Sequence, residues 1–370
     1  MAVMGVSSIA PAFPKVIEAL DVTQGQIGLL ITFFTLPGVV LAPGLGVMAD
    51  RFGRKRVLGP SLLLFALAGT ACAFARDFIL LLILRTLQGI GGASLGSLNT
   101  TIIGDIYSGE QRSEAMGLNA SVLSIGTAFY PTIGGALALM AWYYPFLLPV
   151  IALPIGILVL TVLESPEPRS HQPLKKQLSG TWSYLKNTSV LGLFTASILT
   201  FLLLYGTVLT YFTLLLSDVF NASSFVIGLM FTAMSLATAA VSWQLGAINR
   251  KITIGNIIRL SFVCYGLAFL LIPYMPNIWW LLVPTIIYGI AHGGNIPGLH
   301  TAVASAAPLE YRAAFMSLNA MVLRLGQSIG PPVMALVYIR YGFEGTFIFS
   351  GVIALLTAAI AFGYALRRTG

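Results

Sequence analysis

The chain is a succession of long apolar segments separated by short polar loops. A segment of about 20 apolar residues crosses a bilayer as one helix, and a lipid-embedded backbone must satisfy its own polar groups, which favours helices over strands. Hydrophobic residues make up 57% of the chain and charged residues only 9%, against about 25% charged residues in a soluble protein. The pattern predicts an all-α membrane protein with spans at 27–49, 57–75, 79–105, 114–140, 145–163, 190–215, 225–248, 256–274, 279–303, 313–338 and 344–366.

Residues 1–14 form a further apolar stretch, which is too short for a complete span and contains Pro11 and Pro14. A cleaved signal peptide would carry basic residues before its apolar stretch, and none stand here. We therefore interpret this stretch as the outer end of a truncated first span, which brings the expected total to 12 transmembrane helices.

The two halves of the chain repeat each other at an offset of 200 residues. Segments 110–131 and 310–331 share ten residues in 22 positions, including polar ones such as Asn119 and Asn319. Chance agreement between Leu-rich segments is the alternative, but it does not easily match polar residues at one offset. The repeat predicts two pseudo-symmetric six-helix bundles, 1–163 and 190–370, with a substrate site where the repeats meet.

Basic residues are concentrated in alternate loops, which by the positive-inside rule are cytoplasmic. Once the first span is completed, both termini lie inside the cell, and the net charge of +8 mostly reflects topology. Nucleic-acid binding is not expected, because the cations are dispersed over several loops rather than gathered on one soluble domain. The residues in question are Arg51, Arg54, Lys55, Arg56, Lys175, Lys176, Lys186, Arg250, Lys251, Arg367 and Arg368.

A linker at 164–189 separates the halves and contains Pro166, Pro168 and Pro173. After Pro173, apolar residues recur at helical spacing with lysines elsewhere on the turn. This pattern is typical of a short helix on the cytoplasmic membrane surface. A solvated tether is the alternative, and the sequence does not decide between them.

The loop after the second span carries the most specific motif, since residues 46–55 read Gly-Val-Met-Ala-Asp-Arg-Phe-Gly-Arg-Lys. It resembles the signature loop of the major facilitator superfamily, although Met48 stands where the family usually has Leu. The resemblance implies a cytoplasmic gate that latches the two halves, with Gly46 allowing close helix approach and Gly53 a tight turn. A plain positive-inside loop is the alternative. The gate residues implied are Gly46, Asp50, Arg51, Gly53, Arg54 and, from the fourth span, Asp105.

Two further motifs narrow the resemblance. Segment 84–93, with Arg85 and Gln88, resembles the family's fourth-span motif, in which an arginine lies just inside the outer end. The fifth span, around Gly126 and Pro131, resembles that of the drug–proton antiporters, although Tyr130 stands where glycine is usual. Helix packing alone would explain the glycines, so the antiporter interpretation rests on the resemblance.

In this family spans 1, 4, 7 and 10 surround the pore and spans 2, 5, 8 and 11 flank it. The resemblance therefore implies that polar side chains at mid-depth on these spans line the substrate or proton cavity. The candidates are Arg85, Gln88, Asn99, Asn119, Tyr130, Tyr205, Tyr211, Gln244, Tyr288, His292, Asn295, Asn319, Arg324 and Gln327.

Two of these residues carry specific hypotheses. Arg324 lies near the centre of the eleventh span, where the repeat has Ser124, and no Asp or Glu lies at comparable depth. An ionisable residue inside a membrane is a functional candidate, and a positive one favours an anionic, zwitterionic or neutral amphipathic substrate. The imidazole of His292 has an ordinary pKa that allows proton exchange near neutral pH. A packed histidine with one satisfied hydrogen bond is the alternative.

The sequence thus predicts a secondary active transporter of the prokaryotic cytoplasmic membrane that exports small amphipathic molecules with proton coupling. The alternatives are uptake of an organic anion, a lipid or lipid-linked flippase, and a non-transporting receptor with the same fold. An enzyme is not expected, because the histidines are too few and too far apart for a metal site and no Walker loop is present. We expect a monomer that binds a small-molecule substrate and protons and needs no cofactor.

Overall fold

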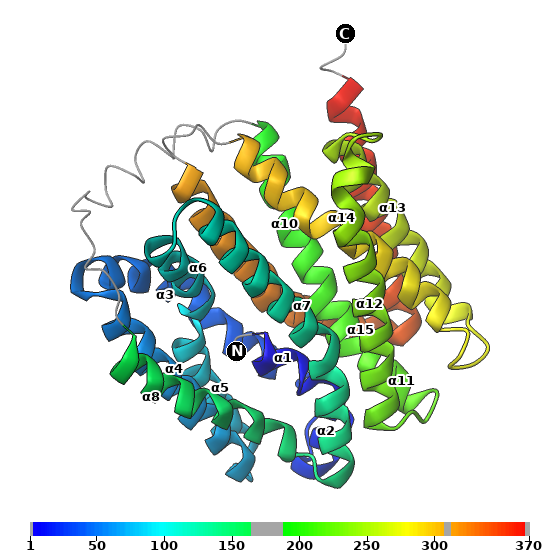
Figure 1. Ribbon diagram of the computed structural model, residues 1–370. Helices are drawn as coiled ribbons and strands as arrows, with labels where there is room; N and C mark the ends of the chain where they lie inside the picture. Colours follow the sequence, from blue (N-terminus) through cyan, green and yellow to red (C-terminus); the bar gives the residue numbers. More distant parts are fainter. Residues whose placement is uncertain (1–2, 164–187, 307–311, 367–370) are drawn as a thin grey trace. The chain divides into compact units, whose positions relative to one another are not determined.

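The computed structural model describes residues 3–163, 188–306 and 312–366, and all of its regular elements in these ranges are helices (Figure 1). The chain divides into two compact units: Met1–Leu174 with Ser223–Gly228, and Lys175–Ala222 with Leu229–Gly370. The surface helix expected in the linker falls almost wholly on 164–187, outside the described residues.

The first unit begins with a nearly continuous helical stretch that ends at Leu20, beyond the expected limit at residue 14. The long helices that follow include α3, α4, α5 and α6, which pack against one another in this unit. The elements are α1 (Met4–Ser7), η1 (Ala10–Ala12), α2 (Phe13–Leu20), α3 (Leu29–Phe52), α4 (Arg54–Ala71), η2 (Cys72–Phe74), α5 (Phe78–Gly92), α6 (Leu95–Ile106), α7 (Gly109–Met140), η3 (Tyr144–Ile151) and α8 (Ala152–Val162).

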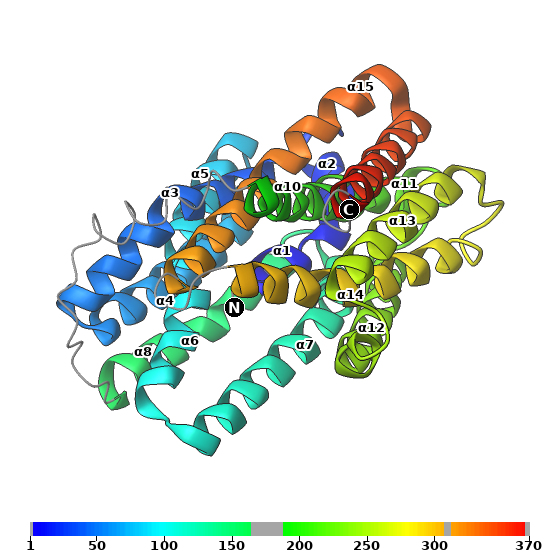
Figure 2. The ribbon, with the colours of Figure 1, turned by 90° about the horizontal axis from the view of Figure 1, so that it is seen from above.

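The second unit holds the remaining helices, among which α13 packs against both α14 and α15, and α10 packs along α15 (Figure 2). The elements are α10 (Thr188–Leu202), η4 (Leu203–Phe212), α11 (Thr213–Asp218), α12 (Ser224–Asn249), α13 (Ile254–Leu271), η5 (Ile272–Tyr274), α14 (Leu282–Ala306) and α15 (Arg312–Leu366).

Within the described ranges, nine helical segments are long and apolar enough to cross a membrane. The last of them, Phe315–Ile360, has 46 residues, enough for two passes of about 20 residues. Gly342 interrupts it with φ 65° and ψ −162°, between the expected eleventh and twelfth spans. Helix α14 is 25 residues long, which is also long enough to cross. Its middle is less apolar because it carries His292 and Asn295.

Three expected spans are less regular than the sequence predicts. The fourth is broken at Ala93–Ser94 into α5 and α6. The sixth begins as a 3₁₀ helix that contains Pro145 and Pro149, each of which lacks a backbone donor. The seventh contains η4, a ten-residue π-helix, and π-helical turns often mark functional sites.

The repeat extends to the packing of helices. A Cβ atom on Gly89 of α5 would lie 2.1 Å from the carbonyl oxygen of Phe34 in α3. A Cβ atom on Gly289 of α14 would lie 2.4 Å from the carbonyl oxygen of Met234 in α12. Both members of each pair differ by 200 in number, so the same close backbone approach occurs in each unit. Thr238 adds a hydrogen bond of 3.0 Å to the carbonyl of Gly289 in the second unit.

Candidate functional site

The turn between α3 and α4 has the geometry that its sequence predicts. Gly53 adopts φ 99° and ψ 137°, which a residue with a Cβ rarely adopts. Arg54 follows at once and forms an ion pair with Asp105 at the end of α6, their side chains being 11% and 31% exposed. The guanidinium of Arg51 lies 5.6 Å from the ring centre of Phe52. Helices α4 and α6 are thereby joined by a pair of opposite charges.

Two other residues of this motif, Gly46 and Asp50, lie in the last part of α3. A Cβ on Gly46 would meet no described atom within 4 Å, so the close helix approach expected at Gly46 stays a prediction. Among the described residues Gly246 in the second half is equally open. Asp50 lies within α3, and its side chain is outside the described part of the structure.

A buried charge lies at the centre of the first unit. Arg85 of α5 is fully buried, and its Nη1 donates to the carbonyl oxygen of Gly5 at 2.8 Å and to Oε1 of Gln88 at 2.6 Å. Its Nε donates to the carbonyl oxygen of Leu30 at 3.1 Å. The guanidinium also lies 4.4 Å from the ring centre of Phe34, within range of a cation–π interaction. These contacts connect α5 with α1 and α3.

Each unit contains a pair of polar side chains that joins two of its own helices, and the two pairs are at equivalent places in the repeat. Asn99 of α6 donates to Oδ1 of Asn119 in α7 at 2.6 Å. In the second unit Asn319 of α15 lies 3.5 Å from Nδ1 of His300 in α14. Asn119 and Asn319 are equivalent in the repeat, and their partners are offset by 201 residues. Tyr130, also on α7, is half-buried, and its ring packs against Gly126 of the same helix.

A cluster of uncharged polar groups lies in the second unit, between α10, α13 and α14. Tyr265 of α13 makes a hydrogen bond of 2.8 Å with Nδ1 of His292. Nδ2 of Asn295 donates to the hydroxyl of Tyr265 at 3.2 Å and to Oγ1 of Thr200 at 2.7 Å. The ring of Tyr288 stacks on His292 with centres 5.6 Å apart. We call these five residues the α14 cluster.

The hydrogen bond between Tyr265 and Nδ1 of His292 can run in either direction, depending on the tautomer of His292. In one arrangement the Tyr265 hydroxyl donates to Nδ1 while its oxygen accepts from Asn295. A neutral imidazole that accepts at Nδ1 carries its proton on Nε2. Protonation of Nδ1 would require the Tyr265 hydroxyl to turn away, so a proton on His292 and the amide of Asn295 are coupled through Tyr265.

The α14 cluster has unused hydrogen-bonding capacity. The Tyr288 hydroxyl and Oδ1 of Asn295 are buried and make no hydrogen bond within the described residues. Buried polar groups are normally paired, and each unpaired one costs on the order of 1–3 kcal/mol. One donor and one acceptor are therefore retained at a cost to stability.

Arg324 lies on α15 and is half-buried. It interacts electrostatically with Tyr205, which lies in the π-helical segment η4. Gln327, one turn further along α15, is also half-buried. Tyr205 is thus a tyrosine that interacts with Arg324, whereas His292 is hydrogen-bonded to Tyr265.

Two members of the α14 cluster, Tyr265 and Thr200, were not expected from the sequence. Tyr265 lies in the ninth span, which the family layout places away from the pore, but its long side chain reaches α14. Thr200 lies in the seventh span, where a threonine usually bonds to its own helix backbone. A lone tyrosine among Phe262, Cys264 and Gly266 was the available signal for the first.

Neither a serine nucleophile nor a metal site is supported by the described residues. Residues 92–96 read Gly-Ala-Ser-Leu-Gly, the spacing of a nucleophile elbow, which requires a strand-to-helix turn. Ser94 instead lies between two helices, is fully buried, and donates to Oγ of Ser61 at 3.1 Å. No group of three or more His, Cys, Asp or Glu side chains that could hold a metal ion occurs among the described residues.

Comparisons with known proteins agree on one family. The sequence profile of the Major Facilitator Superfamily matches residues 1–270 and 207–370. A bacillibactin exporter of Bacillus subtilis (strain 168) is 33% identical over 150 residues, which are 39% of this chain and 37% of that protein. A class B tetracycline resistance protein of Escherichia coli is 24% identical over 347 residues, 90% of this chain and 85% of that protein.

The fold is similar to that of solved transporters. The crystal structure of a nucleoside transporter has a TM-score of 0.84 and 15% sequence identity, and the match covers 98% of this chain and 97% of that one. At this identity the similarity shows the fold alone.

Proposed function

Because the chain belongs to the Major Facilitator Superfamily, we propose that this multi-pass membrane transporter exports small amphipathic molecules in exchange for protons. It works by alternating access in the prokaryotic cytoplasmic membrane, with both termini on the cytoplasmic side. The names of its relatives support the direction of transport, since they include an exporter and a drug-resistance protein.

The observation that carries this proposal is the α14 cluster. Its hydroxyl, amide and imidazole groups can donate and accept hydrogen bonds without a fixed charge, which suits a small molecule that is mostly apolar with a few polar groups. The unpaired hydroxyl of Tyr288 and the unpaired Oδ1 of Asn295 are the groups that we assign to the substrate.

His292 is the residue that we assign to the proton. All 12 Asp and Glu residues lie towards the ends of spans or in loops, so a carboxylate is a poor candidate for a proton site at mid-depth. Histidine ordinarily titrates between pH 5 and 8. Protonation at Nδ1 breaks the Tyr265–His292 bond as it stands and frees the Tyr265 hydroxyl, which offers a link between proton uptake and substrate release.

The ion pair of Arg54 with Asp105 supports a cytoplasmic gate at the motif after α3. In this proposal it stabilises one end state of the transport cycle, with Asp50, Arg51 and Gly53 as the other members. Breaking the pair should change the rate of the conformational step without removing the substrate site.

Reconstitution into liposomes with an imposed pH gradient tests the proposed function. A panel of amphipathic cations, neutral molecules and anions is offered on the side that corresponds to the cytoplasm. Accumulation of at least one compound that collapses when the gradient is dissipated is the expected result. Equal movement with and without the gradient would contradict proton coupling, and specific binding of a compound that does not move under either condition would favour the receptor alternative.

Transport of an organic anion is the second candidate, and the charge of Arg324 favours it. If the substrate is anionic, Arg324→Gln should weaken its binding more than tenfold, equivalent to about 1.4 kcal/mol. Arg324→Lys should restore binding only in part, because the planar fork of the guanidinium is lost. Unaltered affinity in the glutamine variant would remove this candidate.

A further inference from the structure

The outer face of α13 carries an arginine beside two apolar hollows. Arg259 is half-buried and lies five residues after the first residue of α13. Its Nη1 donates to Oδ1 of Asn256 at 2.9 Å. Since this bond uses the amide oxygen, the NH₂ group of the exposed Asn256 is left as a second donor. By the positive-inside rule this end of α13 is cytoplasmic, because Arg250 and Lys251 immediately precede it.

The first hollow lies between α13 and α15 and has a volume of about 510 Å³. Asn256 and Arg259 stand at its polar end. Beyond them its walls are apolar and run toward the membrane interior, with Leu260, Val263, Leu355, Ala358 and Ala359.

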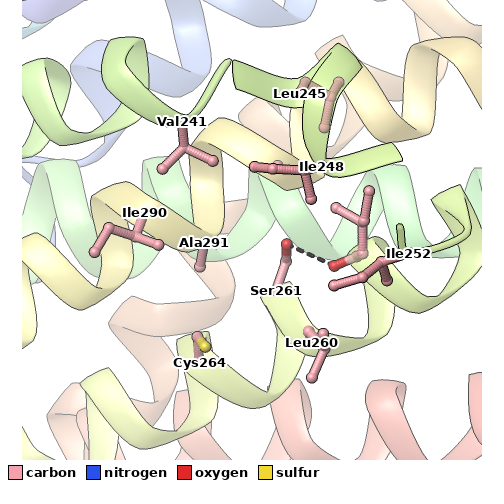
Figure 3. Close-up of a pocket in the computed structure, with 11 residues that line it drawn as sticks. Val241, Leu245, Ile248, Ile252, Leu260, Ser261, Cys264, Ile290 and Ala291 are labelled. Carbon is pink, nitrogen blue, oxygen red and sulfur yellow. Dashed lines mark hydrogen bonds between the residues drawn. The ribbon is translucent and has the colours of Figure 1, made fainter. Parts of the chain in front are cut away.

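The second hollow lies on the other side of Leu260, between α12, α13 and α14, and has a volume of about 130 Å³ (Figure 3). Figure 3 shows Val241, Leu245 and Ile248 on one side of it and Ile290 on another. The two hollows share Ile252 and Leu260. Leu260 is 52% exposed and lines both hollows, so it lies where the two apolar hollows meet.

We propose that a diacyl anionic phospholipid of the cytoplasmic leaflet binds here, with its phosphate on Arg259 and Asn256 and one acyl chain on each side of Leu260. A guanidinium is a strong partner for phosphate oxygens, and the amide of Asn256 offers a further donor. The exposed Lys251 adds positive charge at the level of the headgroup. Basic residues at this leaflet attract anionic lipids, and the paired hollows match a ligand with two chains.

Lipid binding by the purified full-length chain tests this proposal. Delipidated protein in detergent is titrated with dioleoyl phosphatidylglycerol or dioleoyl phosphatidylcholine, and the bound lipid is counted by native mass spectrometry. We expect phosphatidylglycerol to bind at least tenfold more tightly than phosphatidylcholine. Arg259→Gln should remove this preference. Arg259→Lys should show a preference between those of the native protein and the glutamine variant.

Two matched variants separate this site from general electrostatics. Arg340→Gln removes the same charge from an exposed position on α15 and should leave phosphatidylglycerol binding within twofold of the native value. Ala359→Phe narrows the first hollow without changing any charge and should weaken binding at least threefold. Equal affinity for the two lipids, unchanged binding in Arg259→Gln, or an equal loss in Arg340→Gln would overturn the proposal.

Discussion

The buried polar networks of α5 and α14 occupy equivalent places in the repeat but are built differently. In the first unit the central group is a charge, Arg85, and two of its three hydrogen bonds go to backbone carbonyls. A carbonyl in a packed helix cannot turn away from its donor. This network is therefore suited to holding α1, α3 and α5 in one arrangement.

In the second unit the α14 cluster carries no charge while His292 is neutral. Every hydrogen bond in it joins two side chains. The position equivalent to Arg85 is Thr285, and the position equivalent to Gly92 is His292. Side chains can rotate and exchange partners while the helices keep their place. One copy of the repeat can therefore keep a rigid framework, while the other carries the groups that we propose exchange a proton and a substrate.

The largest effect is expected from a substitution in the Arg85 network of the first unit. Arg85→Met should lower the free energy of unfolding by on the order of 3 kcal/mol, because it leaves two carbonyls and the Gln88 amide unpaired in a buried site. Thermal or denaturant unfolding in detergent measures this loss. Arg85→Lys should recover only part of the stability, since one ammonium group cannot reproduce the fork. Native stability in Arg85→Met would show that this network does not hold the unit together.

A second prediction tests whether the framework is common to both halves. Gly89→Ala and Gly289→Ala should each cost about 2 kcal/mol, because the new methyl group would overlap a backbone carbonyl of the neighbouring helix. Gly46→Ala and Gly246→Ala are the matched controls. They have open space around them and should be neutral or stabilising by up to about 1 kcal/mol. A large cost in only one of the two test variants would contradict equivalent packing.

A third prediction concerns the α14 cluster of the second unit. Tyr265→Phe removes the hydroxyl that joins His292 to Asn295 and should cost about 1 kcal/mol of stability. We expect substrate affinity to fall about tenfold, as measured by equilibrium binding to the purified protein. Tyr274→Phe, at a position that is 67% exposed, is the control and should bind normally. Native affinity in Tyr265→Phe would exclude the α14 cluster from the substrate site.

The smallest change in stability is expected at the proposed gate. Asp105→Asn breaks the pair with Arg54, and because Asp105 is partly exposed the loss should be below about 1 kcal/mol. The transport rate should fall severalfold while equilibrium binding stays unchanged. Asp21→Asn is a suitable control, because Asp21 has φ 49° and Asn tolerates that conformation. A lower affinity at an unchanged rate would argue against a gate.

The sequence predicted the helical class, most of the spans and the turn at Gly53, because apolar length and glycine geometry depend on local residues. It did not predict the break at Ala93–Ser94 or the π-helix at 203–212, because these arise where neighbouring helices approach closely. Gly89 and Gly206 illustrate this, since each meets a backbone atom of another helix, which a single segment does not reveal.

The candidate site was predicted in part for a similar reason. Tyr288, His292 and Asn295 lie on one helix and follow from its resemblance to a pore-lining span. Tyr265 and Thr200 come from two other helices, and only the packing of α10 and α13 against α14 brings them to the same point. A list of polar residues at mid-depth cannot show which of them are bonded to one another.

Transport by the His292→Gln variant in liposomes tests whether His292 carries the proton. Uptake driven by a pH gradient and counterflow of substrate without a gradient are measured on the same preparation. We expect gradient-driven uptake to fall at least tenfold while counterflow stays within twofold of the native rate, because glutamine keeps a hydrogen-bonding group but cannot carry the proton. Native gradient-driven uptake in this variant would contradict the assignment of the proton to the α14 cluster.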